Sequence, residues 1–277
     1  MTNVFLDAAL LILAGMSVMA VVGLRARDNS LVDIAYGPLF VLAGWGAWLA
    51  ADGMSDLQPR PLLLLTLVSV WGVRLGLHIG LRHRGRGEDF RYRRFREEWG
   101  DTIVWRSLLQ IYLLQGAVVL VIATPILLAI AAPGGRLGVA DGIGVLLFAA
   151  GFLFEAVSDW QMTVFKRQGE NRGRLIRSGL WRFSRHPNYF GEALLWWGIF
   201  LIGLGAGSGW YGLVSPLVIA FLLLKVSGIP MLEAKYRDNP EFADYKARTS
   251  AFFPWFPRRE GHVTNPHEKR RGNGSTE

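Results

Sequence analysis

Ionisable side chains interrupt the long apolar runs of this sequence at spacings that could support chemistry. Glu155, Asp159 and Lys166 follow one another at offsets of four and seven residues, which places them on one stripe of an α-helix. Arg74 and His78, four residues apart, form a second pair. Charged groups inside apolar helices are costly and usually functional. Such a set could bind a polar ligand, polarise a carbonyl group or transfer protons.

A second polar group lies in the stretch Ser-Arg-His-Pro-Asn-Tyr-Phe-Gly-Glu, residues 184–192. Pro187 suits the first turn of a helix, where its missing N–H is not needed, and Asn188 and Glu192 would share one face of that helix. The N–H groups at such a helix start attract phosphate. The basic side chains near it in the sequence are Arg174, Arg182 and Arg185. The stretch therefore indicates a phosphate site, although an Arg-His-Pro sequence can also precede a membrane span without any function.

Two further pairs could act on a substrate or hold a cofactor. Asp33 and Tyr36 lie about one helical turn apart in another apolar run. An aspartic acid that apolar surroundings keep protonated could donate a hydrogen bond to a developing oxyanion. Glu233 and Tyr236 precede the aromatic stretch 252–257. That stretch could close over a cofactor or rest at the level of the lipid headgroups.

Each of these residues also has a simpler explanation. Arg74 and Lys166 could extend along their helices to the membrane surface, and His78 could be a packing residue. Asp33 could cap a helix by accepting backbone N–H groups. The functional interpretation depends on convergence, because all of these residues are predicted to lie toward the same side of the membrane. Together they could line a polar cavity that opens to that side.

The elements that must position these residues are predicted to be seven transmembrane helices. An apolar run of roughly 18 residues or more can cross about 30 Å of hydrocarbon, and in lipid it must become a helix to satisfy its backbone. The chain has 277 residues, of which 51% are hydrophobic. The predicted spans are 4–24, 32–50, 61–81, 103–131, 137–165, 189–205 and 210–229. The expected fold is therefore an all-α, polytopic membrane protein.

Lys and Arg are distributed very unevenly between the loops that join these spans. The loops around 82–96 and 166–185 are rich in Arg, and the second also contains Lys166, whereas the alternate loops contain only Arg60 and Arg136. Because basic residues favour the cytoplasmic side, this bias predicts an N-terminus outside and a cytoplasmic C-terminus. We expect a membrane domain over residues 1–257 and a disordered cytoplasmic tail over residues 258–277, which is polar and has no apolar period.

Composition excludes several kinds of site. The chain has no cysteine, so disulfides, thiolate zinc sites and a cysteine nucleophile are absent. Its net charge is +8, and the basic residues lie in loops next to the predicted spans. This position favours anionic lipid over nucleic acid as a partner. It has no Gly-x-Gly-x-x-Gly after a strand, no P-loop and no His-Glu-x-x-His. We expect no metal site, and any nucleotide would have to bind inside the helical bundle.

Several of the motifs resemble those of one protein family. They are Glu-Ala-Val-Ser-Asp-Trp-Gln at 155–161, Gly-Leu-Trp-Arg at 179–182, Arg-His-Pro-Asn-Tyr-Phe-Gly-Glu at 185–192 and Val-Ser-Gly-Ile-Pro-Met-Leu-Glu at 226–233. With the closing Phe-Phe-Pro-Trp, they resemble the bacterial DUF1295 proteins, which are related to the steroid 5-alpha-reductase C-terminal domain. The resemblance covers most of the chain. It implies a seven-helix enzyme that holds NADPH on the cytosolic side and transfers a hydride to the β-carbon of an enone.

The resemblance also implies which residues meet the cofactor. Asp159 matches the aspartate of the fifth helix, and Arg174 matches a phosphate-binding arginine. Asn188 and Glu192 match the Asn and Glu of the cofactor-binding helix, and Lys166 stands where the family has an arginine. Arg84 and Arg86 resemble an Arg-Gly-Arg loop. The residues expected to bind the cofactor are Arg84, Arg86, Glu155, Asp159, Lys166, Arg174, Arg185, His186, Asn188, Tyr189, Glu192, Glu233 and Tyr236.

The substrate end departs from the steroid reductases. Where they have Gln-Glu on the second helix, this chain has Val32 and Asp33. Trp71 stands where they carry the catalytic tyrosine, and an indole cannot donate a proton as a phenol does. Tyr36 or His78 could take its place. The residues expected to act on the substrate are Asp33, Tyr36, Arg74 and His78.

These patterns favour an NADPH-dependent reductase of an apolar enone, such as a steroid, a sterol or an isoprenoid-like lipid, in a bacterial inner membrane. One alternative is a methyltransferase, because Arg-His-Pro-x-Tyr-x-Gly is also a signature of the isoprenylcysteine carboxyl methyltransferases, which bind S-adenosylmethionine. The Arg-rich loops suit a cofactor with phosphates, which S-adenosylmethionine lacks. A third possibility is a non-enzymatic membrane protein on the same fold.

Overall fold

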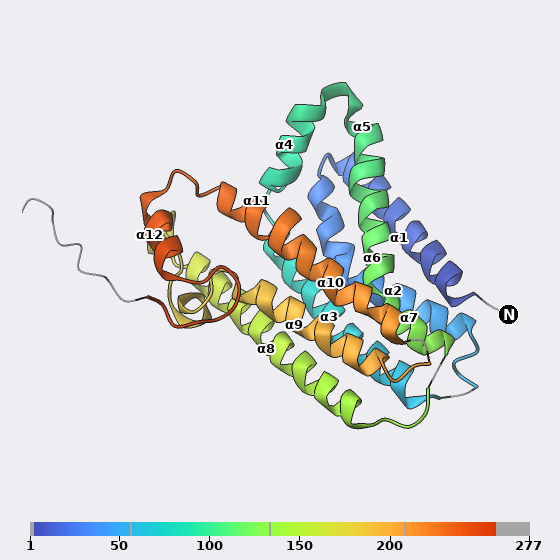
Figure 1. Cartoon of the computed structure of the whole chain (residues 1–277). Coiled ribbons are helices and arrows are strands. Elements are labelled where there is room, and N and C mark those ends of the chain that lie inside the picture. The colour runs from blue at the N-terminus through green and yellow to red at the C-terminus, as the bar shows by residue number, and fades with distance from the viewer. Residues whose placement is uncertain (1–2, 56, 133, 208, 259–277) are drawn as a thin grey trace, which may run out of the picture.

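The computed structural model describes residues 3–55, 57–132, 134–207 and 209–258, which form helices and connecting turns without any strand (Figure 1). The helices are α1 (Val4–Ala26), α2 (Val32–Ala50), α3 (Pro59–His83), α4 (Phe90–Trp99), α5 (Ile103–Arg106), α6 (Leu114–Ile122), α7 (Thr124–Ala131), α8 (Val139–Arg167), α9 (Pro187–Gly203), α10 (Val214–Phe221), α11 (Ile229–Ala234) and α12 (Pro240–Arg248). A π-helical stretch, Ser107–Leu113, joins α5 to α6, and a second, Leu222–Val226, follows α10. The predicted all-α fold is confirmed.

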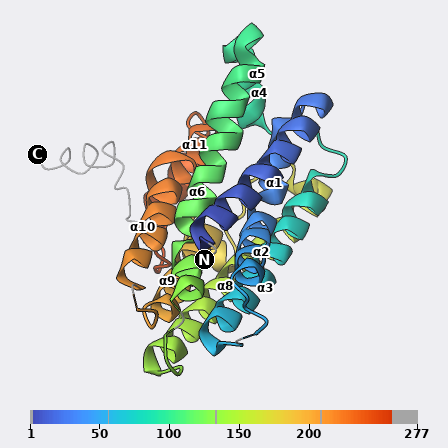
Figure 2. The same ribbon diagram turned by 90° about the vertical axis from the view of Figure 1, so that its right-hand side faces the viewer.

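Within the described residues, six helical segments are long and apolar enough to cross a membrane. They comprise α1, α2, α3, the stretch from α4 to α6, α8 and the stretch from Gly209 through α10 to Ala234. The long helices run alongside one another in both views, and α4 and α5 project beyond one end of the bundle (Figures 1 and 2). The helix α9, which corresponds to the sixth predicted span, has 17 residues and is not among the six. The count of seven spans therefore stays a prediction.

Two helices of the structure were not predicted, because neither contains a long apolar run. The first is α4, an Arg-rich helix whose N-cap, Asp89, accepts from the backbone N–H of Arg91. The second is α12, in which Asn239 caps the first turn. The predicted span 103–131 also differs, because it is divided at Ala123, just before Pro125 opens α7. Proline lacks the N–H that a continuous helix would need there.

Glycines bring the backbones of α8 and α9 into direct contact. A Cβ atom on Gly151 would lie 2.5 Å from the carbonyl oxygen of Gly191, and a Cβ on Gly191 would lie 2.5 Å from that of Gly151. Gly144 and Gly198, seven residues away on each helix, repeat this arrangement. Small residues allow such close packing of helices in membranes. The contact places the backbone of Glu155 directly beside α9, at the position of Gly191.

The helices α3 and α8 are joined by two arginine–carboxylate pairs rather than by close backbone packing. At one end, Arg60 donates to both oxygens of Asp141, at 3.0 and 3.1 Å. At the other end, Arg74 donates to Glu155 at 2.6 Å. The two arginines are fourteen residues apart, and so are the two carboxylates. The pairs therefore hold α3 and α8 parallel to each other, with equally spaced positions of the two helices side by side.

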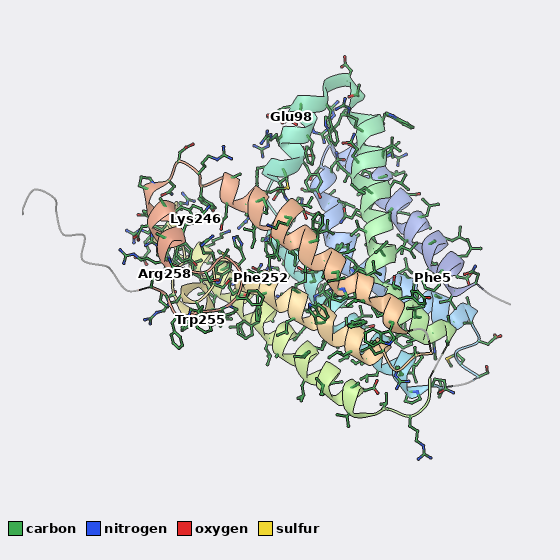
Figure 3. All side chains as sticks on the ribbon, in the orientation of Figure 1. Phe5, Glu98, Lys246, Phe252, Trp255 and Arg258 are labelled. Carbon is green, nitrogen blue, oxygen red and sulfur yellow. The ribbon has the colours of Figure 1, made fainter. Side chains whose placement is uncertain are left out.

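The last described residues, 249–258, form a strap across the start of α9. Trp255 donates its backbone N–H to Phe183 at 2.9 Å, and Arg185 donates its own to Ser250 at 2.8 Å. Phe252 is buried, whereas Phe253 and Trp255 are about 70% exposed. Phe252, Trp255 and Lys246 lie near one end of the α8–α9 pair (Figure 3). Apart from Arg258, the predicted disordered tail lies outside the described residues.

Candidate functional site

Arg74 of α3 joins the two predicted carboxylates of α8. Its Nη1 donates to Glu155 Oε1 at 2.6 Å, and its Nη2 donates to Asp159. Trp71, one turn earlier on α3, donates its indole N–H to the other oxygen of Glu155 at 2.9 Å. The Arg74 side chain is 19% exposed and the Glu155 side chain 3% exposed. Arg74 thus points inward to these partners instead of extending to the membrane surface.

Asp159 also connects this cluster to α9 and to His78. Asn188 donates to Asp159 Oδ1 at 3.3 Å, and His78 Nε2 lies 3.8 Å from Asp159 Oδ2. Glu192, one turn after Asn188, is half-buried and acts electrostatically on both Glu155 and Asp159. The predicted residues of α3, α8 and α9 therefore meet in one place. We call Arg74, Glu155, Asp159, Asn188 and Glu192 the inner cluster.

Glu192 is the member of the inner cluster that has no partner. Both oxygens of Glu155 and both oxygens of Asp159 accept hydrogen bonds. For Glu192 the described part of the chain provides neither a hydrogen bond nor an ion pair. The Glu192 side chain is half-buried. Its carboxyl group therefore remains available to a ligand.

Aromatic rings border the inner cluster on the side of α2. The ring of Tyr36 lies 5.3 Å from that of Phe40 and 6.3 Å from that of Trp71, and Trp196 of α9 lies 5.3 Å from Trp71. The close contact of Gly37 with α3 brings Tyr36 beside Trp71. The Tyr36 hydroxyl forms no hydrogen bond to any described residue, and it lies within electrostatic range of Glu155 and Glu192.

Four basic side chains meet where α3, α8 and α11 end. Lys166 lies within electrostatic range of Arg82, Arg86 and Lys235. None of the four forms an ion pair with a carboxylate of the described chain. Lys235 instead lies 5.3 Å from the centre of the Phe90 ring. Although Asp89 lies within electrostatic range of Arg82, the group carries more positive than negative charge, which favours an anionic ligand. We call these four residues the basic mouth.

The basic mouth shares Lys235 with a hollow on the surface. The hollow, of about 660 Å³, is lined by basic residues, which include Lys235, Arg172 and Arg174, and by the acidic residues Asp238 and Glu241. On the inner side, Tyr189 lies within electrostatic range of Arg82 as well as of Glu192 and Asp159. We call this succession of polar side chains, from basic residues outside to carboxyl groups inside, the polar path.

The side chains of the Arg-His-Pro motif bind other residues of this chain instead of facing the polar path. Arg185 donates through Nε and Nη2 to Glu233 at 2.8 Å, and His186 Nε2 lies 3.3 Å from the same oxygen. Lys246 pairs with the other oxygen at 3.2 Å. The arginine also donates to the carbonyl of Thr249 in the strap. This arrangement ties α11, α12 and the strap to the start of α9 and leaves the Arg185 and Glu233 side chains without a free position for a cofactor.

The remaining predicted residues lie at the edges of the site. The Tyr189 ring stacks on His186 with 5.5 Å between centres, and the Tyr236 ring packs against Phe242 at 5.5 Å. Arg84 follows the last residue of α3, and its side chain is exposed.

Asp33 accepts hydrogen bonds instead of donating them. Arg91 donates to one of its oxygens at 2.8 Å, and the Tyr92 hydroxyl donates to the other at 2.6 Å. Asp33 thus holds α4 against the start of α2. With both oxygens engaged by donors, its carboxylate is better suited to this structural task than to the predicted donation of a hydrogen bond to an oxyanion.

Asp89 provides a test of the α4 attachment by pH. Although burial tends to raise its pKa, the charge and hydrogen bonds of Arg91 lower the pKa below the usual 3.8. A lowered folded pKa means that the stabilisation is complete above pH 3.8 and disappears as the pH falls through the folded value. We expect Asp89→Ala to cost about 1 kcal/mol of stability at pH 7, typical of a lost N-cap, and the part of this cost that depends on the carboxylate charge to be lost as the pH falls below 3.8.

Thermal unfolding between pH 7 and pH 3 would measure this difference. Asp89→Asn is the matched control, because asparagine keeps the N-cap but has no charge to titrate. A cost of Asp89→Ala that stays constant down to pH 3 would show that the carboxylate charge plays no part.

The sequence model for a protein family of unknown function, DUF1295, matches residues 19–249. The chain belongs to the DUF1295 family. It is also similar to an uncharacterised protein of Schizosaccharomyces pombe, C594.04c, with 27% identity over 293 residues that cover 91% of this chain and 80% of the yeast protein. No solved structure matches the chain.

All residues of the inner cluster and of the basic mouth lie inside the DUF1295 match. The sequence did not indicate several of them. Trp71 was considered only as a departure from a tyrosine, but its position three residues before Arg74 puts both on one face of α3. Arg82 and Lys235 each stand just beyond an apolar run, where basic residues are usual, and so carried no separate signal. Their convergence depends on how α3, α8 and α11 end together.

Proposed function

We propose that this DUF1295 protein is a membrane-embedded reductase that uses NADPH to reduce the conjugated C=C bond of an apolar enone, such as a steroid, a sterol or an isoprenoid-like lipid. The observation that supports the proposal is the division of charge along the polar path. Within the described residues, basic side chains that form no ion pair lie at its outer end, and the Glu192 carboxyl, which has no hydrogen bond, lies at its inner end. NADPH suits such a division, because its nicotinamide ring lies at one end, its pyrophosphate in the middle and its third phosphate toward the adenine end.

Particular residues suit each part of such a cofactor. The pyrophosphate would be held by the basic mouth, Arg82, Arg86, Lys166 and Lys235, whose charges lack carboxylate partners in the described chain. Arg172 and Arg174 in the hollow would hold an outer phosphate. Asn188 and Glu192 would orient the nicotinamide ring, which supplies the hydride when the cofactor is bound. The inner carboxylates fit a carboxamide, which is a hydrogen-bond donor.

Tyr36 is the residue that we propose for the substrate. Its hydroxyl has no partner within the described residues and lies near Glu192, so it would donate a hydrogen bond to the carbonyl oxygen of the enone. A donor held in place where negative charge develops is a large catalytic term. Phe40, Trp71 and Trp196 offer apolar surface for the substrate, and His78, half-buried beside Asp159, would supply protons from the cytoplasm. Arg74 would position both carboxylates.

The topology that goes with this function has seven spans, with α9 as the sixth despite its 17 residues. The distribution of Lys and Arg supports an N-terminus outside and the polar path opening to the cytoplasm. In a bacterial inner membrane, this orientation gives the site access to cytosolic NADPH from one side. An apolar substrate would then enter sideways from the lipid.

One observation favours a second candidate, an S-adenosylmethionine-dependent methyltransferase. A partnerless carboxyl group beside aromatic rings, as Glu192 is beside Tyr36, would also suit a sulfonium cation. Glu233, the other residue that suggested this class, is engaged by Arg185 and His186. The basic mouth has no task in binding a cofactor without phosphates. A non-enzymatic protein with the same fold would need neither the basic mouth nor the inner cluster.

Stabilisation by ligands tests these candidates in the detergent-purified protein. We expect NADPH to raise the melting temperature in proportion to the logarithm of its concentration, because it binds the folded state alone. Lys166→Ala and Arg86→Ala should each weaken NADPH binding about tenfold or more, since each removes one charge from the phosphate site. Arg94→Ala is the matched control, because Arg94 is a basic residue of the same side that pairs with Glu98 at the surface.

Each ligand result has a separate meaning. Stabilisation by S-adenosylmethionine and not by NADPH would replace the reductase by the methyltransferase. Stabilisation by neither would remove both enzymes and leave the non-enzymatic protein.

A further inference from the structure

The strap presents three aromatic side chains to its surroundings. Phe253, Trp255 and Phe256 are between 68% and 77% exposed, whereas Phe252 is buried. The strap is nevertheless fixed in place, because the backbone N–H of Trp255 donates to the carbonyl oxygen of Phe183 at 2.9 Å. Large apolar groups that are held in an exposed position indicate a surface that meets another molecule or a lipid.

The segment just before α9 fixes the level at which the strap lies along α8. Trp181 donates its indole N–H to the carbonyl oxygen of Ser158 at 3.1 Å. Leu180 donates its backbone N–H to the side-chain oxygen of Gln161 at 3.0 Å. Phe183, which binds the strap, follows Trp181 by two residues. The strap is therefore attached near this turn of α8 and not at the end of that helix.

This turn of α8 is also the place where the helix is expected to leave the hydrocarbon. A hydrocarbon layer of about 30 Å takes roughly 20 helical residues, which, counted from the first residue of α8, Val139, end near Ser158. Leu146, Leu153 and Trp160 follow one another at intervals of seven residues, and each is at least 60% exposed. They form one lipid-facing stripe of the helix, and tryptophan favours the interface between hydrocarbon and water.

The exposed rings of the strap are continuous with the two helices beneath it. The ring of Phe154 of α8 lies 5.3 Å from the ring of Phe190 of α9, and Phe190 lies 5.9 Å from Phe253. Phe190 also contacts the buried ring of Phe252, at 5.7 Å. The aromatic surface therefore extends from the membrane helices onto the strap without a break.

A basic side chain lies at the edge of this aromatic surface. The guanidinium group of Arg182 lies 6.0 Å from the centre of the Phe183 ring, against which the Phe256 ring packs at 5.7 Å. Arg182 is exposed and forms no ion pair with a described carboxylate. Aromatic rings next to a free guanidinium suit the headgroup layer, where acyl chains and phosphates lie close together.

We infer that Phe253, Trp255 and Phe256 insert into the headgroup layer of the phospholipid bilayer that surrounds the helices, with Arg182 at the lipid phosphates. The strap is then a membrane anchor, and its three exposed rings face lipid instead of closing over a cofactor. The inference goes beyond the proposed function and does not depend on it.

The anchor has a consequence for α9, because the strap is bonded to the residues that precede this helix. Arg185 donates its backbone N–H to the carbonyl oxygen of Ser250 at 2.8 Å, and the Ser184 hydroxyl donates to that of Phe252 at 2.8 Å. A strap that is held by lipid therefore fixes the start of α9, and with it Asn188, at one depth in the membrane.

Contact with lipid can be measured with a single fluorescent label, because the chain has no cysteine of its own. Phe256→Cys, labelled with bimane, would be reconstituted into vesicles of phosphatidylcholine and phosphatidylglycerol. Part of the phosphatidylcholine would carry bromine in the upper acyl chain, which quenches fluorescence on contact. We expect a loss of fluorescence close to that of labelled Leu153→Cys, on the exposed stripe of α8. Labelled Glu98→Cys is the control in water, because Glu98 lies on α4, which projects beyond the bundle (Figures 1 and 3).

Trp255→Cys provides a second labelled position, which keeps the test valid if Phe256→Cys disturbs the strap. Labels at both positions that brominated lipid quenches as weakly as the label of Glu98→Cys, and that iodide in the water quenches well, would show that the strap lies in water. Labels that neither brominated lipid nor iodide quenches would show that protein covers the rings, such as a second copy of this chain. Either result would overturn the membrane anchor and leave the proposed function untouched.

Discussion

Replacing Gly151 by alanine is expected to destabilise the protein by about 3 kcal/mol, the upper end of the range for overpacking, and to abolish cofactor binding. The added Cβ would lie 2.5 Å from the carbonyl oxygen of Gly191 and 2.5 Å from the backbone nitrogen of Leu195. Both are backbone atoms that cannot rotate away. The helices α8 and α9 must therefore separate, and Glu155 moves away from the residues of α9.

Gly142→Ala provides the matched control, because Gly142 lies on the same helix with no atom within 4 Å of its Cβ position. It should leave stability unchanged or raise it slightly, since alanine favours helix. Thermal unfolding in detergent would measure both variants, with a fall of roughly 10 °C expected for Gly151→Ala. Equal melting temperatures for the two variants would mean that α8 and α9 do not touch as described.

Arg74→Met is expected to cost about 3–5 kcal/mol, as is typical when one partner of a buried ion pair is removed. The change leaves Glu155 and Asp159 facing one another and Glu192 without any compensating guanidinium. Arg74→Lys should be intermediate, because a single ammonium group cannot reach both carboxylates as the planar guanidinium does. Arg94→Met, at an exposed pair, should cost less than about 1 kcal/mol.

A double variant separates the role of Arg74 in stability from its role in binding. Arg74→Met combined with Glu155→Gln removes one charge from each side of the pair and should recover a large part of the lost stability. Nucleotide binding should remain weak, because the inner cluster no longer holds Asp159 and Asn188 in place. If the double variant is no more stable than Arg74→Met, the cost does not arise from an uncompensated carboxylate.

Hydropathy and helical spacing predicted the parts of the molecule that follow from local sequence. The second predicted span, 32–50, agrees with α2, and the spacing of Glu155 and Asp159 correctly put both on the face of α8 that meets Arg74. These predictions work because lipid forces apolar runs into helices and because helix geometry fixes which residues share a face.

The sequence could not indicate which distant residues would meet. Asp33 is engaged by Arg91, 58 residues later, and Glu233 by Arg185, 48 residues earlier. Each of these residues had a reasonable role as a free side chain, and only the packing of α4 and α12 shows which side chains of the protein engage it. The partnerless state of Glu192 likewise depends on where Arg74 points, which is a property of the folded chain.

The equal spacing of the two arginine–carboxylate pairs between α3 and α8 restricts how this region can change length during evolution. One residue inserted between Arg60 and Arg74 would turn one arginine by about 100° relative to the other, so that one of the two pairs would be lost. The same insertion made also between Asp141 and Glu155 would not restore the pair, because Glu155 would turn in the same sense about its own axis and the two side chains would point opposite ways. DUF1295 sequences that retain both pairs should therefore keep the spacing of fourteen residues in both helices, without single-residue insertions or deletions.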